Sequence, residues 1–363
     1  MAITESIILE FPYVEGSSDY DNMTEGPQIS ECNKDLQLFH KMFQPVVYGV
    51  VLLVGLLGNG LLMAVLLRRL GSLRVTEIYL LHLALADLLL LFTFPFTLSQ
   101  SMVGWVFGSF MCKAVGLLSF LNFLCGSLLL AFISFDRYLA IVRAVESMRA
   151  RRPRGVHFTC ASMWLLSLCL SAPNAVFMSV DTEHIANTTV TYCYFFSHGL
   201  HSNNWNLARR FITHLCFFLP LALMTYCYSA VVFTLCRTTR SRDKQGAIRL
   251  AMLITVVFCL SWLPYNLALL VNTLVDLDII SLSCESLAQL ERATVVTESI
   301  GYSHCCINPL LYAFVGVRFR QDLLRLLGHW GCRWTPCLRA MRGERASNAS
   351  FSEGAGTTNS SLI

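Results

Sequence analysis

The sequence is poor in charged residues: Asp, Glu, Lys and Arg together make up 14% of its 363 residues. Soluble globular domains carry about 25% charged residues. Hydrophobic residues make up 55% of the chain, and the mean hydropathy is +0.56. This balance excludes a disordered chain and a collagen, and it argues against a soluble enzyme. The open question is how many times the chain crosses a membrane.

Motifs of several enzyme and transporter classes are also missing. The sequence has no phosphate-binding Walker motif, no His-Glu-x-x-His zinc motif and no nucleophile elbow. It shows no internal repeat of the kind that marks many transporters. We therefore expect a protein that is not an enzyme, has no catalytic residues and needs no cofactor. A transporter remains as a remote alternative, and nothing indicates a nucleic-acid partner.

Seven stretches are long and apolar enough to span a bilayer, which takes ~20 mainly apolar residues. They are 42–67, 78–110, 114–135, 155–180, 211–236, 250–275 and 293–317. Because lipid cannot satisfy backbone polar groups, each stretch is expected to be a helix. The sequence predicts an all-α membrane protein in which residues 42–317 form a seven-transmembrane helix bundle. Buried core helices of a soluble protein are the alternative, and seven runs of this length argue against it.

The distribution of charge predicts the orientation of the bundle. Arg and Lys crowd the connections after the first, third and fifth stretches and the segment after the seventh. Residues 1–41 hold eight acidic residues against two lysines. Since cytoplasmic loops are rich in Lys and Arg, residues 1–41 are expected to form an extracellular acidic N-terminal tail. The chain is then a multi-pass plasma-membrane protein.

The segment after the seventh stretch is amphipathic. Within residues 318–330, Phe319, Leu323, Leu324 and Leu327 fall on one helical face. This pattern predicts a short eighth helix on the inner membrane surface, in contact with membrane lipids. A frayed basic tail is the alternative. Residues 331–363 are expected to form a cytoplasmic tail with phosphorylatable Ser and Thr, and its first cysteines are candidates for palmitoylation.

Two carboxylates lie inside the predicted spans, Asp87 in the second and Glu298 in the seventh. An intramembrane carboxylate is costly and indicates a functional site. A hydrogen bond that packs two helices is the alternative. Glu298 lies near the outer end of its helix, where a carboxylate suits a cationic ligand group. We expect Glu298 to be buried and without a partner until such a ligand arrives.

Four of the fifteen cysteines, Cys32, Cys112, Cys193 and Cys284, fall on the outer side. Disulfides are stable in that oxidising compartment. Four cysteines allow three pairings, and the sequence alone does not choose among them.

The outer side also carries modification signals. Asn22 and Asn187 each begin an Asn-x-Thr sequon, so both are predicted to be glycosylated. Tyr20 stands between Asp19 and Asp21, in a setting that favours tyrosine sulfation. Sulfation would add to the negative charge of the tail.

Motifs on all seven predicted helices resemble those of the rhodopsin-like G-protein-coupled receptors, over roughly residues 40–330. They are Gly58-Asn59, Leu83-Ala-Leu-Ala-Asp87, Asp136-Arg137-Tyr138, Trp164, Pro220, Trp262-Leu-Pro264 and Asn308-Pro309-Leu-Leu-Tyr312. One such motif would be weak, but all of them in order are specific.

A second set of motifs resembles the chemokine receptors. It comprises Thr93-Phe-Pro95, Trp105-Val-Phe-Gly108, His304-Cys-Cys-Ile-Asn308 and Glu298 near the outer end of the last helix. Within that family the chain is most similar to the CXC branch, slightly more to its type-five than to its type-three members.

The resemblance implies roles for individual residues. It implies the disulfides Cys112–Cys193 and Cys32–Cys284. The implied ligand-binding residues are Glu298, Tyr20, Asp19, Asp21, Trp105, Tyr265, Asp276 and Asp278. The implied residues for activation and G-protein coupling are Asp136, Arg137, Tyr138, Tyr228, Trp262, Pro264, Asn308, Pro309 and Tyr312.

Two departures from the family pattern affect these expectations. Gly126 replaces a serine that commonly helps to hold a sodium ion, which weakens the case for sodium at Asp87, Asn122 and Asn308. Lys244 stands where rhodopsin has an acid that locks the arginine of the third helix. We therefore expect the neighbouring Asp136 to be the main restraint on Arg137.

The function that the resemblance implies is that of a cell-surface chemokine receptor. It would bind a basic CXC chemokine, activate an inhibitory-class heterotrimeric G protein to direct cell migration, and recruit arrestin after phosphorylation of the tail. A non-signalling scavenger of chemokines is the alternative, and the intact Asp136-Arg137-Tyr138 motif argues against it.

Overall fold

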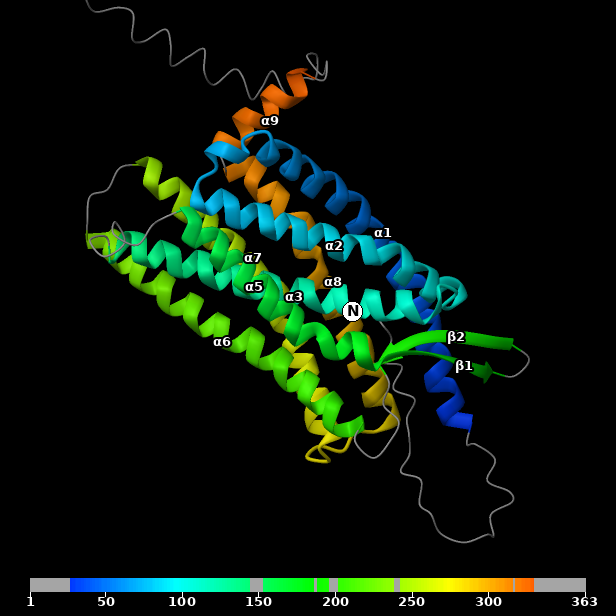
Figure 1. Cartoon of the computed structure of the whole chain (residues 1–363). Helices are drawn as coiled ribbons and strands as arrows, with labels where there is room; N and C mark the ends of the chain where they lie inside the picture. Colours follow the sequence, from blue (N-terminus) through cyan, green and yellow to red (C-terminus); the bar gives the residue numbers. More distant parts are fainter. Residues whose placement is uncertain are drawn as a thin grey trace, which may run out of the picture.

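The computed structural model describes the backbone of residues 27–143, 153–185, 188–195, 202–237, 242–315 and 317–329. Its long helices pack side by side into one bundle (Figure 1). They are α1 (Pro27–Leu67), α2 (Val75–Val103), α3 (Gly108–Ile141), α5 (Pro153–Phe177), α6 (Ser202–Arg237), α7 (Arg242–Asp276) and α8 (Cys284–Val315). Shorter elements are the 3-10 turn η1 (Leu70–Ser72), the strands β1 (Met178–Ile185) and β2 (Thr188–Phe195), and the helix α9 (Val317–His329).

α3 lies at the centre of the bundle and packs against α2, α5, α6 and α7. Its residues Leu124, Leu129 and Leu130 are fully buried. α8 closes the bundle by packing against both α1 and α7. The all-α seven-helix bundle expected from hydropathy is therefore confirmed, and α9 is the expected short amphipathic helix that follows it.

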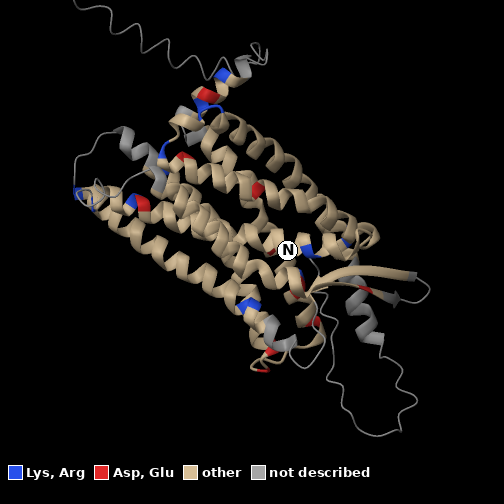
Figure 2. Ribbon diagram, viewed as in Figure 1, with Lys and Arg blue, Asp and Glu red and all other residues tan. Residues whose placement is uncertain are grey.

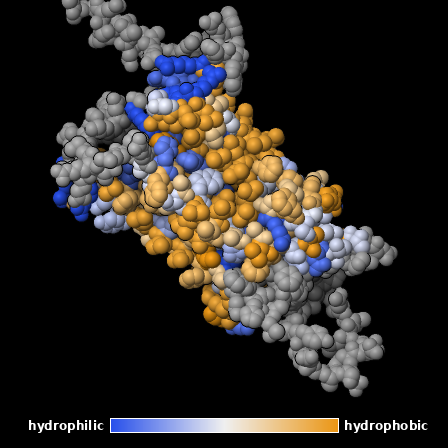
Figure 3. Space-filling view, viewed as in Figure 1, coloured by the Kyte–Doolittle hydropathy of each residue, from blue (hydrophilic) through white to orange (hydrophobic). Residues whose placement is uncertain are grey.

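The outside of the bundle is apolar. Leu53, Leu57 and Phe158 are among the many large hydrophobic side chains exposed on its surface. On the face shown in Figure 3, hydrophobic residues cover much of the bundle. Among the described helices, six are long and apolar enough to cross a membrane by composition alone. α8 is the long helix outside that set, because it carries polar and charged residues such as Glu298 and His304. Those two side chains are buried inside the bundle rather than exposed to lipid.

Charge divides between the two ends of the bundle, as the sequence predicts. Lys and Arg gather at the end that carries α9, and acidic residues gather near the end that carries the hairpin (Figure 2). We call these the inner and the outer end. Within the apolar middle, Asp87 and Glu298 are buried.

The structure departs from the sequence prediction in two respects. Several helices extend past the apolar stretches: α1 begins at Pro27 rather than 42, and α6 at Ser202 rather than 211. Hydropathy detects only the part of a helix that lies in lipid, so polar turns beyond it were missed. The antiparallel hairpin β1–β2 was also not predicted. Its β-branched residues, such as Val180 and Thr191, favour strands.

Small residues set the close approach of α1 to α8. A Cβ added at Gly58 would lie 2.8 Å from Cβ of Pro309, so only glycine fits there without a shift. One residue on, the Asn59 side chain donates hydrogen bonds to the carbonyls of Gly55 (3.0 Å) and Cys305 (2.9 Å). Glycine and asparagine therefore join α1 to α8 by close packing and by a hydrogen bond.

Gly58→Ala should destabilise the protein. The new methyl meets the rigid ring of Pro309, and overpacking of this kind costs about 1–3 kcal/mol. Gly60→Ala is the matched control, because nothing lies within 4 Å of a Cβ at Gly60 and alanine is the better helix former. Thermal unfolding of the purified protein in detergent should show a lower midpoint for Gly58→Ala alone. Equal midpoints for the two variants would contradict the packing argument.

Candidate functional site

The outer end is organised by a disulfide between Cys112 of α3 and Cys193 of β2. This is the pairing that the resemblance implied. Trp105 lies beneath the hairpin and is 3% exposed. Its indole N–H donates to the carbonyl of Gly108 (2.9 Å), and its backbone N–H donates to the carbonyl of Thr191 (2.6 Å). In this structure Trp105 therefore supports the hairpin and presents little surface to a ligand.

Gln100 of α2 is a second support that sequence reasoning missed. Its amide N–H donates to the Cys193 carbonyl (3.3 Å), and its amide oxygen accepts from the Cys193 N–H (3.1 Å). The side chain is buried, so both hydrogen bonds are shielded from water. A single polar residue in an apolar helix gives no signal of this role, because the partner lies 93 residues away in sequence.

Several predicted outer-side residues lie outside the described residues. They are Tyr20, Asp19, Asp21, the side chain of Cys32 and the two sequon asparagines, Asn22 and Asn187. Cys284 is a half-buried free cysteine at the start of α8. The bridge from Cys32 to Cys284 therefore stays a prediction.

Glu298 is buried in the outer half of the bundle, with 3% of its surface exposed. The expectation that it lacks a partner is wrong. The hydroxyl of Tyr302, one turn further along α8, donates a hydrogen bond to Glu298 Oε1 (3.2 Å). A buried carboxylate needs such partners because desolvation without them is costly. Sequence reasoning missed Tyr302, although the spacing of four residues on one helix face indicates contact.

Tyr302 connects Glu298 to an aromatic cluster deeper in the bundle. Its ring meets the ring of Trp262 edge-on, with centroids 5.4 Å apart. Trp262 also meets Phe123 of α3 (4.9 Å) and Tyr265 of its own helix (5.6 Å). A Cβ at Gly301 would lie 2.8 Å from the Trp262 ring, so α8 offers the indole a flat backbone surface. Trp262 thus touches α3 and α8 while standing two residues before Pro264, inside α7.

The acidic residues at the outer end of α7 differ in their surroundings. Asp276 forms an ion pair with Arg210 of α6 (2.5 Å). Asp278 lies just after α7, is exposed and adopts a left-handed backbone conformation (φ 55°). A cationic ligand would therefore have to compete with Arg210 for Asp276.

Asp87 is fully buried at the middle of the bundle and is surrounded by donors from α3 and α8. Asn122 (3.1 Å), Asn308 (3.3 Å) and the Cys305 thiol (3.3 Å) all donate to its carboxylate. His304 Nε2 lies 3.5 Å from Asp87 Oδ1. The ligating atoms of Asp87, His304 and Cys305 lie within 4.8 Å of one another, a spacing that could hold a metal ion. Sodium at Asp87, Asn122 and Asn308 stays a prediction.

The inner end holds the arginine of the Asp136-Arg137-Tyr138 motif. Arg137 pairs with Asp136 (2.9 Å), as expected, and also donates to Thr76 Oγ1 of α2. The Tyr138 ring lies near the Tyr226 ring of α6 (5.8 Å). The arginine is therefore held between α3 and α2.

Two further tyrosines link helices at this end. The hydroxyl of Tyr228 in α6 lies 3.2 Å from that of Thr255 in α7. Tyr312, three residues after Pro309 in α8, meets Phe319 of α9 with ring centroids 6.4 Å apart. The residues expected to take part in activation thus lie on helices that contact one another.

The structure is a seven-helix membrane bundle. A disulfide ties its outer hairpin to α3, polar residues are buried inside it, and a paired arginine lies at its inner end. Together these features define a transmembrane receptor. The family "7 transmembrane receptor (rhodopsin family)" matches residues 58–312, and the chain belongs to that family.

Curated relatives narrow this assignment. The chain is 40% identical to C-X-C chemokine receptor type 5 of Rattus norvegicus, over 93% of this chain and 92% of that protein. It is 39% identical to C-X-C chemokine receptor type 3 of Homo sapiens, over 97% of this chain and 93% of that protein. It is 41% identical to C-X-C chemokine receptor type 1 of Macaca mulatta, over 87% of this chain and 90% of that protein. The chain is therefore a member of the CXC branch of the chemokine receptors, a multi-pass plasma-membrane protein and not an enzyme.

Replacing Gln100 should loosen the outer hairpin. Gln100→Met removes both hydrogen bonds to Cys193 and leaves the buried backbone N–H and carbonyl of Cys193 unsatisfied. The free energy of unfolding should fall by on the order of 2 kcal/mol. Ser101→Ala is the matched control, because in the described part of the chain the Ser101 hydroxyl bonds only to Leu98 of the same helix (2.9 Å). Thermal unfolding should show a lower midpoint for Gln100→Met than for Ser101→Ala. A Gln100→Met protein as stable as the wild type would disprove the supporting role.

Proposed function

We propose that the protein is a signalling receptor for a basic CXC chemokine and activates an inhibitory-class heterotrimeric G protein to direct cell migration. The observation that carries the proposal is the buried Glu298, joined through Tyr302 to Trp262. A cationic group that enters from the outer end can change the partners of Glu298. That change reaches the aromatic cluster at the middle of the bundle by direct contact.

Charge at the outer end supports a basic ligand. The N-terminal tail carries eight acidic residues, among them Asp19 and Asp21 on either side of Tyr20, and Asp278 is exposed next to α7. An anionic surface speeds the association of a cationic partner and discriminates against anionic ones. The tail would capture the folded part of the chemokine first. The flexible amino terminus of the chemokine would then enter the bundle and meet Glu298.

Activation would follow from a difference in ligand affinity between two packings of the bundle. With a ligand cation at Glu298, Tyr302 is free to change its contact with Trp262. Trp262 lies beside Pro264, and a proline inside a helix removes a backbone hydrogen bond and eases bending. Movement of α7 would separate Tyr228 from Thr255 and open the inner end to the G protein.

The basic inner loops would then contact the G protein, with Arg137 released from Asp136 and Thr76. Arrestin would bind after phosphorylation of Ser and Thr in residues 331–363. The scavenger alternative shares the outer end and differs only in this inner response.

A signalling screen tests the proposal directly. Cells that express the chain are exposed to a panel of basic CXC chemokines, and inhibitory G-protein activation and chemokine uptake are recorded together. Activation by one chemokine would support the proposal and name the ligand. Uptake without activation would overturn it in favour of the scavenger.

Glu298→Gln should impair receptor activation more than it impairs binding of the chemokine to the N-terminal tail. The substitution keeps the shape of the side chain but removes its charge, and a hydrogen bond to a charged group contributes about 1.5–3 kcal/mol. The chemokine concentration for half-maximal activation should rise roughly 10- to 100-fold, by the same reasoning. Thr297→Ala is the control, because among the described residues the hydroxyl of the half-buried Thr297 donates only to carbonyls of α8. Unchanged potency of Glu298→Gln would remove Glu298 from the ligand site.

Arg137→Ala should abolish G-protein activation and leave chemokine binding within about twofold, since Arg137 lies at the opposite end of the bundle from Glu298. Thr76→Val keeps the arginine and removes one of its restraints, so basal activation should rise. Both variants are checked for surface expression, chemokine binding and G-protein activation. Signalling by Arg137→Ala at the wild-type level would contradict the assigned coupling role.

A further inference from the structure

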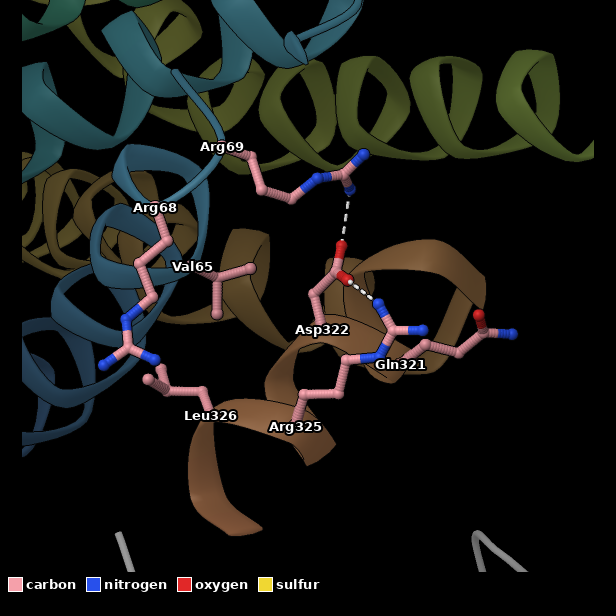
Figure 4. Close-up of a pocket in the computed structure, with 7 residues that line it drawn as sticks. All are labelled: Val65, Arg68, Arg69, Gln321, Asp322, Arg325 and Leu326. Carbon is pink, nitrogen blue, oxygen red and sulfur yellow. Dashed lines mark hydrogen bonds and ion pairs between the residues drawn. The ribbon is translucent and has the colours of Figure 1, made fainter. Parts of the chain in front are cut away.

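A pocket of about 460 Å³ lies at the inner end, between the end of α1 and α9. The chemokine mechanism does not use it. Arg68 and Arg69 enter it from the α1 side, and Gln321, Asp322 and Arg325 enter it from α9 (Figure 4). Its volume falls within the range of small-molecule sites, about 300–1,000 Å³.

The pocket has an excess of positive charge. Three arginines face one carboxylate, Asp322, which gives two positive charges in excess among the lining residues. Asp322 pairs with Arg69 (2.5 Å) and lies 3.6 Å from Arg325. These pairs use only part of the donor capacity of the two guanidinium groups, since each guanidinium has five N–H donors.

Arg68 differs from the other two arginines. In the part of the chain that the structure describes, no acidic side chain forms an ion pair with it. Its guanidinium is directed away from Asp322 and toward the side where Leu326 lies (Figure 4). It is exposed, so its charge is available to an anion in the pocket.

The surroundings of the pocket are those of a membrane boundary. Val65 and Leu326 give it two buried apolar walls. Leu67 and Leu70 beside it are 51% and 60% exposed, and the apolar surface of α1 continues from there into the membrane. An occupant can therefore place an anionic group against the arginines and an apolar chain along α1.

We propose that this pocket binds the phosphorylated headgroup of an anionic phospholipid in the inner leaflet. The planar fork of arginine matches phosphate oxygens in a bidentate geometry. Two excess positive charges favour a headgroup with more than one negative charge, which selects a phosphoinositide over a singly charged phospholipid. The inference does not rest on the proposed chemokine ligand, only on the membrane location of α1 and α9.

Such a lipid would also fasten α9 to α1. It would add to the ion pair of Asp322 in α9 with Arg69, which lies just after α1. Phe319 of α9 contacts Tyr312 of α8, so the lipid would steady a helix that touches an activation residue.

The test uses the full receptor in nanodiscs of phosphatidylcholine that contain a small fraction of phosphatidylinositol bisphosphate. Native mass spectrometry counts the phosphoinositide molecules that remain bound as their fraction is raised. Arg68→Gln and Arg325→Gln should each weaken binding at least about tenfold, because each removes direct hydrogen bonds between a charged group and the phosphate. The double variant should weaken it roughly 100-fold if the two contributions add.

Arg320→Gln is the matched control. It removes the same charge from α9 at a position that does not line the pocket, and binding should change less than about twofold, as expected of a residue without direct contact. An equal loss in Arg320→Gln would mean that the lipid is held only by the diffuse positive charge of the helix, and the site would be rejected. Unchanged binding in Arg68→Gln and Arg325→Gln, with unaltered thermal unfolding, would also reject it.

Soluble anions distinguish a lipid from a free phosphate. The proposal expects inorganic phosphate and inositol trisphosphate to displace the lipid only weakly, because neither has an acyl chain to lie along α1. Displacement at equal molar concentration would show that the pocket takes a soluble anion, and the lipid assignment would be overturned.

Discussion

The packing of the bundle depends on burying the Asp87 carboxylate without leaving it unsatisfied. A charge in an apolar interior is tolerated only when hydrogen-bond donors or opposite charges surround it. Asp87 of α2 obtains its donors from Asn122 of α3 and from Asn308 and Cys305 of α8. The carbonyl of Cys305 in turn accepts a hydrogen bond from Asn59 of α1. One carboxylate thus fixes how four helices lie relative to one another, and the apolar contacts fill the space between them.

Glu298 is a buried carboxylate of a different kind. Its hydrogen bond from Tyr302 joins two turns of α8, whereas the bonds to Asp87 join separate helices. The hydrogen bond from Tyr302 to Glu298 therefore lies within one helix, and the hydrogen bonds to Asp87 hold separate helices together. Trp262 contacts Tyr302, the hydrogen-bond partner of Glu298, and His304, whose ring lies near Asp87, with ring centroids 5.4 Å and 6.0 Å away. The indole therefore contacts a neighbour of each buried carboxylate.

The sequence predicted the features that depend on composition along one segment. Hydropathy located the helices, charge set their orientation, and motif resemblance singled out Asp136, Arg137 and Trp262. The resemblance also implied the Cys112–Cys193 disulfide, but other contacts between distant segments were not predicted. Two examples depend on contacts between different elements. They are the hydrogen bonds of Gln100 with Cys193 and the ion pair of Arg210 with Asp276. A single polar residue gives no signal of a distant partner. Tyr302 lies only four residues from Glu298, so helical spacing could have prevented the wrong expectation that Glu298 has no partner.

The contacts at the inner end bear on how readily the bundle can switch. Arg137 pairs with Asp136 of α3 and Thr76 of α2. Between α6 and α7 the structure shows the hydroxyl contact of Tyr228 with Thr255 and an apolar cluster that includes Val231 and Ile248. A neutral hydrogen bond contributes only about 1 kcal/mol, and apolar side chains can exchange neighbours without exposing a charge. Opening the inner end between α6 and α7 would therefore disturb a neutral hydrogen bond and apolar contacts, and a ligand could drive it by binding one packing better than the other.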